Sequence, residues 1–306
     1  MQQYLEAKRQ HGDAIVFFWM GDFYEMFYED ALIVSRALEI TLTSRSKGAD
    51  GVAIPMCGIP HHAANGYLMR LVRKGFRVAI CEQVENPKKG KGIVRREVVR
   101  VVSPGTFTDA GYLEEREPAF LVGIVLEHGH PNPRSAPAPD RYGMALLDVS
   151  TGEFVTAEYE GGTARQALRD DLAVLRPREV LLSSVEGRQP LLPDVPAPTV
   201  TTVEPWIFDR DRSKEALLAQ LGTAGVEGFG LSNRSLAVTA AGALVQYLRE
   251  TQKTQLSHVR SVSFRNVTDA MIVDPPTMKH LEVLVSSEGT RTGSLLAEID
   301  QTVTAM

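Results

Sequence analysis

Cysteines are scarce and long apolar runs are absent, and these two features exclude several classes of protein. Cys57 and Cys81 are the only cysteines and form no C-x-x-C pair, so we expect neither a disulfide framework nor a metal site of the zinc type. No apolar run approaches the ~20 residues that a membrane span requires. Residues 1–6 show no basic region followed by an apolar core, so we expect no signal peptide, a cytoplasmic location and no membrane partner.

A phosphate-binding P-loop is also missing, because no G-x-x-x-x-G-K-[S/T] motif occurs among the 306 residues. We therefore expect no enzymatic activity and no cofactor in this chain as it stands. No internal repeat is found, which argues against a solenoid or a propeller. The length predicts two to three domains, each large enough to bury a core of its own.

Charge is distributed unevenly along the chain, although the net charge is only −5. Residues 1–100 carry 15 basic and 11 acidic side chains, whereas the remainder carries 18 basic and 27 acidic ones. A positive balance of this kind indicates a polyanionic partner for the N-terminal third. A solvated basic surface gives the same count, so charge alone leaves both interpretations open.

A mixed α/β domain is predicted for the N-terminal third, ending near residue 110. Helices are expected at 2–11, 30–38 and 63–74, and strands at 14–20, 40–44, 76–83 and 95–102. Asp30 is expected to cap the second helix, and Gly75 to end the third. The prolines of residues 54–60 exclude a helix there, and residues 44–51 read as a polar, basic loop.

A second α/β domain is predicted over residues 111–254. Its expected strands lie at 119–126, 142–148, 153–159 and 178–182, with a short extended piece near Val200. Its expected helices lie at 163–175, 213–221 and 233–254. The first three strands follow one another as a meander, and the first helix leads to the fourth strand by a crossover, which makes a βαβ unit.

The last segment, residues 255–306, differs from both domains. A hairpin is predicted at 262–273, and Asp274 followed by two prolines indicates the start of a helix. A further helix is expected after Gly293. The chain stops inside this pattern, so we expect it to be the N-terminal part of a longer protein.

The most unusual stretch is residues 21–28, in which four aromatic side chains surround one acid, Glu25. If residues 23–27 are extended, Phe23, Glu25 and Phe27 lie on one face, because side chains alternate along a strand. A core strand with Glu25 at its rim is the ordinary interpretation of such a run. The alternative is an exposed aromatic and carboxylate pair that binds a ligand.

Residues 17–28, with the sequence FFWMGDFYEMFY, resemble the mismatch-recognition motif of the MutS family of DNA mismatch repair proteins. Further blocks resemble the family in the same order, at residues 54–63, 78–83, 98–106, 146–154, 251–252, 274–281 and 293–306. A lone F-Y-E triplet would be a weak signal, whereas several co-linear blocks that cover essentially the whole chain are a specific one.

The resemblance implies that Phe23 wedges into the minor groove beside a mismatched base and stacks on it. Insertion costs roughly a few kcal/mol of unstacking, least where pairing is already defective, so selectivity comes from the deformability of the DNA. Glu25 is implied to hydrogen-bond the same base. Phe23 and Glu25 are therefore expected to form an exposed pair, and Phe27, Phe17 and Phe18 to lie in the core.

Other residues are implied to contact the DNA around this pair. The resemblance gives DNA-binding positions to Arg45, Met56, Arg96 and Arg100, and a basic loop carries Lys88, Lys89 and Lys91. The cationic side chains among them would meet phosphates and supply attraction without sequence preference. A solvated surface charge is the alternative explanation for each of them.

The family also implies an organisation for the whole chain. Residues 1–110 correspond to a mismatch-recognition domain, 111–254 to a connector domain of RNase H-like α/β fold, and 255–306 to the start of a mostly α-helical core or lever domain. The implied partners are double-stranded DNA with mismatches or small loops, a second copy in a homodimer, and downstream repair proteins that contact the connector domain. ATP and Mg²⁺ belong to a C-terminal part of the family that lies beyond this chain, and a nucleoid-associated location is implied.

Two other functions are compatible with the residues. A metal-dependent nuclease of RNase H-like type would use Asp148 near a strand end with Glu153 and Glu158 nearby, since two-metal catalysis needs several convergent acids. Asp148 is equally explained as the opening residue of a hairpin. A protein-interaction module without DNA binding is the second alternative, because the second domain is acidic, and His128 and His130 lack a second pair of metal ligands.

Overall fold

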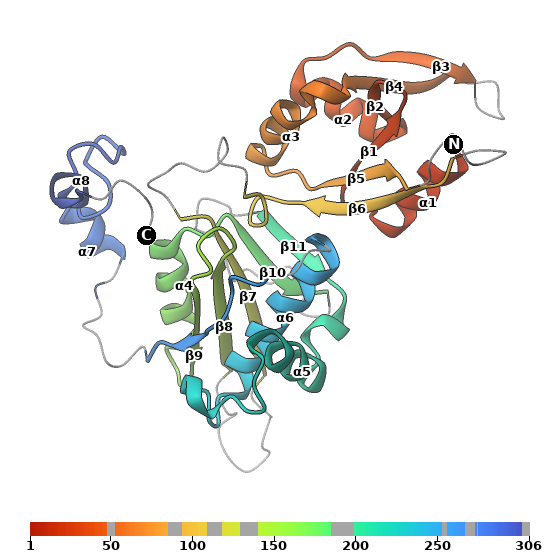
Figure 1. The fold of residues 1–306 in the computed structure, drawn as a ribbon. Helices are drawn as coiled ribbons and strands as arrows, with labels where there is room; N and C mark the ends of the chain where they lie inside the picture. Colours follow the sequence, from red (N-terminus) through yellow and green to blue (C-terminus); the bar gives the residue numbers. More distant parts are fainter. Residues whose placement is uncertain are drawn as a thin grey trace. The chain divides into compact units, whose positions relative to one another are not determined.

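The computed structural model describes residues 1–47, 53–84, 94–108, 118–128, 140–184, 199–252, 256–266, 273 and 275–301, without the side chains of residues 45–47 and 275. Two compact units divide the chain. The first unit comprises residues 1–107 and 248–255, and the second unit comprises 108–247 and 256–306. Each unit has its own six-stranded sheet with both parallel and antiparallel pairs, which confirms the predicted mixed α/β class (Figure 1).

The sheet of the first unit has the strand order β3-β4-β2-β1-β5-β6. Its elements are α1 (Gln2–Gln10), β1 (Ile15–Met20), β2 (Phe23–Phe27), α2 (Tyr28–Leu38), β3 (Thr43–Lys47), β4 (Ala53–Pro60), η1 (His61–Ala63), α3 (Ala64–Arg73), β5 (Val78–Gln83) and β6 (Arg96–Val102). β1 runs parallel to β5, and the other neighbours are antiparallel. β2 is therefore a central strand with a partner on each side.

Different helices cover the two faces of this sheet (Figure 1). The ring of Tyr4 in α1 packs on Phe18 and Phe27, with centroid distances of 5.7 and 5.1 Å. On the other face, the thiol of Cys57 in β4 donates to the carbonyl oxygen of Ala31 in α2 at 3.6 Å. Phe18 and Phe27 are buried, as predicted.

Asp30 does not cap α2, contrary to the sequence prediction. The helix begins at Tyr28, so Asp30 lies within its first turn, and it is only 1% exposed. Its carboxylate accepts hydrogen bonds from the Tyr4 hydroxyl at 2.8 Å, from Lys8 Nζ at 2.8 Å and from the backbone N–H of Val16 at 2.9 Å. Burial of a charge is tolerated here because it is paired and hydrogen-bonded.

The sheet of the second unit has the order β11-β10-β7-β8-β9-β12. Its elements are β7 (Phe120–Glu127), β8 (Arg141–Asp148), β9 (Phe154–Tyr159), α4 (Ala164–Leu175), β10 (Glu179–Ser183), β11 (Thr199–Val203), η2 (Pro205–Phe208), α5 (Arg210–Leu221), η3 (Glu227–Phe229), α6 (Ser235–Gln252), β12 (Ser263–Phe264), α7 (Pro275–His280) and α8 (Leu295–Ile299). β7, β8 and β9 form the predicted antiparallel meander, and β10 lies parallel to β7 after the predicted crossover.

Helices also cover both faces of the second sheet. Leu168 and Leu172 of α4 pack into a cluster with Val122 and other apolar residues of the strands. On the opposite face, a Cβ added to Gly143 would lie 2.4 Å from the backbone carbonyl of Leu236 in α6. The glycine is thus required because the helix backbone comes into direct contact with β8.

Several elements differ from their predicted positions. β3 occupies residues 43–47 instead of 40–44, and β12 pairs in parallel with β9 instead of opening a local hairpin. Residues 270–272 of the expected second hairpin strand, and the expected cap Asp274, lie outside the described residues. α7 and α8 begin where helices were expected, but a larger helical core domain stays a prediction. None of the helices in the described part of the chain is long and apolar enough to cross a membrane.

Candidate nucleic-acid interface

Phe23 is exposed at the start of β2, whereas the next four residues of the strand are buried. Its side chain is 45% exposed. A turn at Gly21 and Asp22 precedes it, and Gly21 has a φ of +60°, which glycine adopts without strain. Single exposed apolar side chains are common on protein surfaces, so this exposure makes the Phe23 ring accessible to a ligand and does not by itself indicate one.

Glu25 lies on the same face of β2 but is buried, so the prediction of an exposed pair is right for Phe23 and wrong for Glu25. The Glu25 side chain is only 6% exposed. It stands two residue pairs deeper in the sheet than Phe23, opposite Phe18 on β1 and Gly58 on β4. Neighbours on both sides of a central strand enclose this position, which the residue pattern of β2 by itself could not indicate.

Gly58 has no side chain beside Phe23 and Glu25, and there is room for a Cβ at this position. A Cβ at Gly58 would lie 3.6 Å from Cδ1 of Phe23 and 4.0 Å from Cγ of Glu25. Met56, the predicted DNA contact on the same strand, is buried opposite Phe27. Sequence reasoning missed Gly58, although an isolated glycine within a strand is a known sign that a ligand or another backbone approaches closely.

The guanidinium group of Arg96 contacts the end of β1. Nε donates to the carbonyl oxygen of Trp19 at 2.7 Å, and Nη1 donates to that of Val94 at 3.0 Å. The group also lies over the ring of Phe18, 5.4 Å from its centroid. These contacts hold the start of β6 to β1, and the predicted phosphate contact of Arg96 stays a prediction.

Arg100 is exposed on β6, as a phosphate-binding residue must be. Its charge acts on Tyr24, whose hydroxyl donates to Oε1 of Glu82 at 3.0 Å. Burial and the Glu82 carboxylate raise the pKa of Tyr24, and Arg100 offsets part of that increase. Arg100 is thus close enough to the aromatic stretch for its charge to be felt there.

The side chains of the other predicted cations lie outside the part of the chain that the structure describes. Arg45 lies on β3, the edge strand of the sheet, but its side chain is outside the described part. Lys88, Lys89 and Lys91 also lie outside the described residues. Their contacts with DNA therefore stay predictions.

Two of the three acids expected in a nuclease, Asp148 and Glu158, accept hydrogen bonds that explain them structurally. Asp148 accepts hydrogen bonds from the backbone N–H and hydroxyl of Ser150 at 2.8 and 2.6 Å, and from the N–H of Ala119 at 3.1 Å. Glu158 accepts from two backbone N–H groups in the first turn of α6, at 2.9 and 3.0 Å. No group of three or more His, Cys, Asp or Glu side chains in the described ranges is arranged to hold a metal ion.

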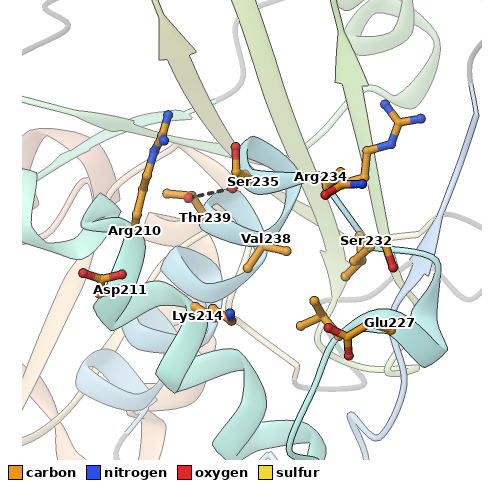
Figure 2. A pocket seen from close by; sticks show the side chains of 12 residues that line it. Arg210, Asp211, Lys214, Glu227, Ser232, Arg234, Ser235, Val238 and Thr239 are labelled. Carbon is orange, nitrogen blue, oxygen red and sulfur yellow. Dashed lines mark hydrogen bonds between the residues drawn. The ribbon is translucent and has the colours of Figure 1, made fainter.

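A cavity of about 310 Å³ lies in the second unit, lined by the starts of α5 and α6 and by η3 (Figure 2). Its charged lining residues are Arg210, Asp211, Lys214, Glu227 and Arg234. Arg210 is paired with Glu127, and Arg234 lies 3.7 Å from the carboxylate of Glu158. Charges of both signs surround this cavity, so it indicates no single class of ligand.

Comparison with known proteins gives two family matches, MutS domain I over residues 1–111 and MutS domain II over 135–260. The DNA mismatch repair protein MutS of Pelotomaculum thermopropionicum is 44% identical over 100% of this chain. The proteins of the same name from Symbiobacterium thermophilum and Alkaliphilus oremlandii are 40% and 39% identical over 99% and 100% of it. The chain spans 34% of the length of each of these relatives.

The two matches and the two mixed sheets define the class of this protein as an α/β chain that contains MutS domains I and II. The chain belongs to the MutS family, as the sequence motifs predicted. Phe23, Gly58 and Arg100 all lie within the part that matches domain I.

Proposed function

We propose that the first unit recognises mismatched or looped base pairs in duplex DNA by inserting Phe23 into the minor groove. The exposure of Phe23 at the end of a buried strand carries this proposal. Inserting an aromatic ring costs roughly a few kcal/mol of unstacking per base step. Because the cost is lowest where pairing is already defective, a mismatched step accepts the ring more readily than a matched one.

Glu25 would discriminate between bases rather than attract the DNA. A carboxylate is repelled by phosphates, so it contributes favourably only if it accepts a hydrogen bond from a base N–H or donates one when protonated. Phe23 and Glu25 both lie beside Gly58, so a base that approaches the backbone of Gly58 would meet the ring and the carboxylate together. Since Glu25 is buried in the free protein, the proposal requires the ring of Phe23 to move away as it enters the base stack.

Attraction to the duplex would come from cations of the first unit. Arg100 is exposed, and Arg45, Lys88, Lys89 and Lys91 are proposed to join it at the phosphates. Neutralised phosphates release counterions, so this part of the binding should weaken as salt is raised. Arg96, which is half-buried, is proposed to contact a phosphate and to hold β1, and Met56, which is buried, would contribute by packing opposite Phe27.

The cellular process is proposed from the relatives, whose names are those of DNA mismatch repair proteins. Residues 1–110 would recognise the mismatch, 111–254 would form the connector that contacts downstream repair proteins, and 255–306 would begin a helical core. Homodimer formation, ATP and Mg²⁺ binding, and coupling of recognition to ATP hydrolysis would depend on parts of the family outside this chain. A nucleoid-associated location would follow from DNA binding.

A competition-binding experiment tests the central proposal. The intact chain is titrated with a labelled G·T duplex against unlabelled matched or G·T competitors at two salt concentrations. Base stacking on an aromatic side chain is worth about 1–3 kcal/mol, so Phe23→Ala should reduce the preference for the G·T duplex by about five- to a hundredfold. Binding of matched DNA should keep its affinity and its salt dependence.

Trp206→Ala is the matched control, because Trp206 is a similarly exposed aromatic residue, at 40%, in the second unit. It should leave the preference unchanged. A Phe23→Ala protein that still prefers the G·T duplex would show that Phe23 is not the wedge.

A further inference from the structure

Three aromatic rings are stacked beside the turn that carries Phe23. The ring of His61, the first residue of η1, lies between the rings of Trp19 on β1 and Tyr24 on β2. Its centroid is 4.8 Å from that of Trp19, with planes 26° apart, and 5.3 Å from that of Tyr24, with planes 19° apart. Parallel stacks of this kind add to the energy of ordinary apolar burial.

Two of these three residues also hold the backbone of the turn itself. The indole Nε1–H of Trp19 donates to the carbonyl oxygen of Gly21 at 2.7 Å. The backbone N–H of His61 donates to the carbonyl oxygen of Asp22 at 2.8 Å. Both residues that precede Phe23 are therefore tied to the stack through their carbonyl groups.

The stack lies on the sheet face opposite to Phe23. Trp19 and Tyr24 are paired directly across β1 and β2, so their side chains share a face, and Phe23 points to the other one. The stack thus leaves the surface of Phe23 uncovered. It can fix the angle at which that ring leaves the sheet without competing for the DNA.

Charged groups anchor the stack from two sides. Glu82 on β5 accepts the hydrogen bond of the Tyr24 hydroxyl at 3.0 Å. Arg96 on β6 donates to the carbonyl oxygen of Trp19 at 2.7 Å. Movement of the stack would therefore require contacts with β5 and β6 to break, which makes it a firm support for the turn.

We propose that Trp19 and His61 are positioning residues for mismatch recognition: they fix the Gly21–Asp22 turn and thereby hold Phe23 ready for insertion. This inference rests on the proposed wedge function of Phe23. A flexible turn would leave Phe23 with more orientations to lose when it enters the DNA, and that entropy would weaken binding at a mismatch. Matched DNA, which does not take up the ring, would be bound as before.

The experiment uses the full chain with Trp206→Phe, because the chain has two tryptophans and this change leaves Trp19 as the sole indole reporter. His61→Ala, His61→Phe and Phe23→Ala are compared in that background. The readouts are the ratio of affinities for G·T and matched duplexes, and the change of Trp19 emission when each duplex is added.

His61→Ala should lower the affinity ratio by about three- to tenfold, as expected when an aromatic pair is lost, while matched binding stays the same. His61→Phe should restore the ratio because it restores the stack. In the Trp206→Phe background, Trp19 emission should change on binding the G·T duplex and not the matched one, because only the mismatched duplex takes up the Phe23 ring next to the turn that Trp19 holds. Trp19→Phe, which keeps a ring but removes the bond to Gly21, should also lower the ratio.

The possible failures are distinct. If Phe23→Ala keeps the ratio, the wedge proposal fails and this inference with it. If Phe23→Ala loses the ratio while His61→Ala keeps it, the wedge stands and the positioning role is wrong. If His61→Phe fails to restore the ratio, or if His61→Ala weakens matched binding equally, the imidazole acts on the DNA or on folding and the positioning role is again wrong.

Discussion

The hydroxyl group of Tyr4 donates a hydrogen bond to Oδ2 of Asp30 at 2.8 Å, and both side chains are buried. The Tyr4 hydroxyl oxygen also accepts a hydrogen bond from the backbone N–H of Phe27 at 3.3 Å. One phenol thus ties α1 to the end of β2 and to the first turn of α2. The strand that carries Phe23 is held at its far end by this contact.

Tyr4→Phe should therefore destabilise the first unit. Removing the hydroxyl leaves a buried carboxylate with fewer donors, which costs about 1–3 kcal/mol. Urea unfolding followed by Trp19 emission, in a chain with Trp206→Phe, measures the free energy of unfolding of this unit. Tyr28→Phe removes the hydroxyl of an exposed tyrosine and is the control. Equal losses in the two variants would contradict the role given to Tyr4.

The stability of the first unit should fall at alkaline pH. Burial raises the pKa of Tyr4 and Tyr24, and it raises the pKa of the Cys57 thiol to about 12. In the unfolded chain these groups have pKa values of roughly 8.5–10. At pH values between these pKa values and the higher ones of the folded state, the folded state binds more protons than the unfolded state. Its stability is then fully present below about pH 8 and is lost as the pH rises.

The free energy of unfolding, measured by Trp19 emission at pH 8, 10 and 11, should decrease along that series. Tyr4→Phe should make the decrease shallower because one group with a raised pKa is gone, whereas Tyr28→Phe should not. A flat or rising series would show that these groups are not protonated in the folded unit as described.

Two helical glycines should respond to the same substitution with opposite signs. A Cβ at Gly242 in α6 would lie 1.9 Å from the carbonyl oxygen of Ser213 in α5, whereas a Cβ at Gly66 in α3 would meet no atom within 4 Å. Gly242→Ala should cost about 3 kcal/mol or more, since a backbone must move. Gly66→Ala should stabilise its unit by about 0.5–1 kcal/mol. Thermal unfolding of the second unit is followed by Trp206 emission in a chain with Trp19→Phe, and that of the first unit by Trp19 emission in a chain with Trp206→Phe. A tolerated Gly242→Ala would contradict the close approach of the helices.

Much of the fold is encoded locally and could be predicted. The apolar run of β1 and the three consecutive strands of the meander follow from their patterns, because a strand buried on both sides needs apolar residues throughout. The predictions that were wrong concern contacts between residues far apart in the chain. The groups that donate hydrogen bonds to the buried carboxylate of Asp30 lie 14 to 26 positions away in the chain, and β12 pairs with a strand more than 100 residues earlier. Such pairings leave no mark on a local pattern.

In the candidate site, too, some features could be predicted from the sequence and others could not. Phe23 could be predicted to matter because its motif resembles a family block, and its exposure agrees with that prediction. The burial of Glu25 depends on neighbours from β1 and β4, and the stack of Trp19, His61 and Tyr24 is assembled from three elements. Neither arrangement could be derived from the spacing of the residues.

Gly58 should control access of a base to Phe23 and Glu25. A Cβ at this position would make only ordinary contacts, 3.6 Å from the Phe23 ring and 3.7 Å from the carbonyl oxygen of Tyr24, so Gly58→Ala should fold without loss of stability. Gly58→Leu adds a larger side chain that covers the backbone beside Phe23 and Glu25. It should lower the affinity for a G·T duplex by about tenfold, which corresponds to about 1.4 kcal/mol, and leave matched binding as it was.

Competition binding of the two variants, with thermal unfolding as a check on stability, separates occlusion from misfolding. Gly58→Ala is the matched control because it changes the backbone freedom of the strand in the same way without filling the space. If Gly58→Leu is folded and still prefers the G·T duplex as strongly as Gly58→Ala, bases do not enter above Gly58.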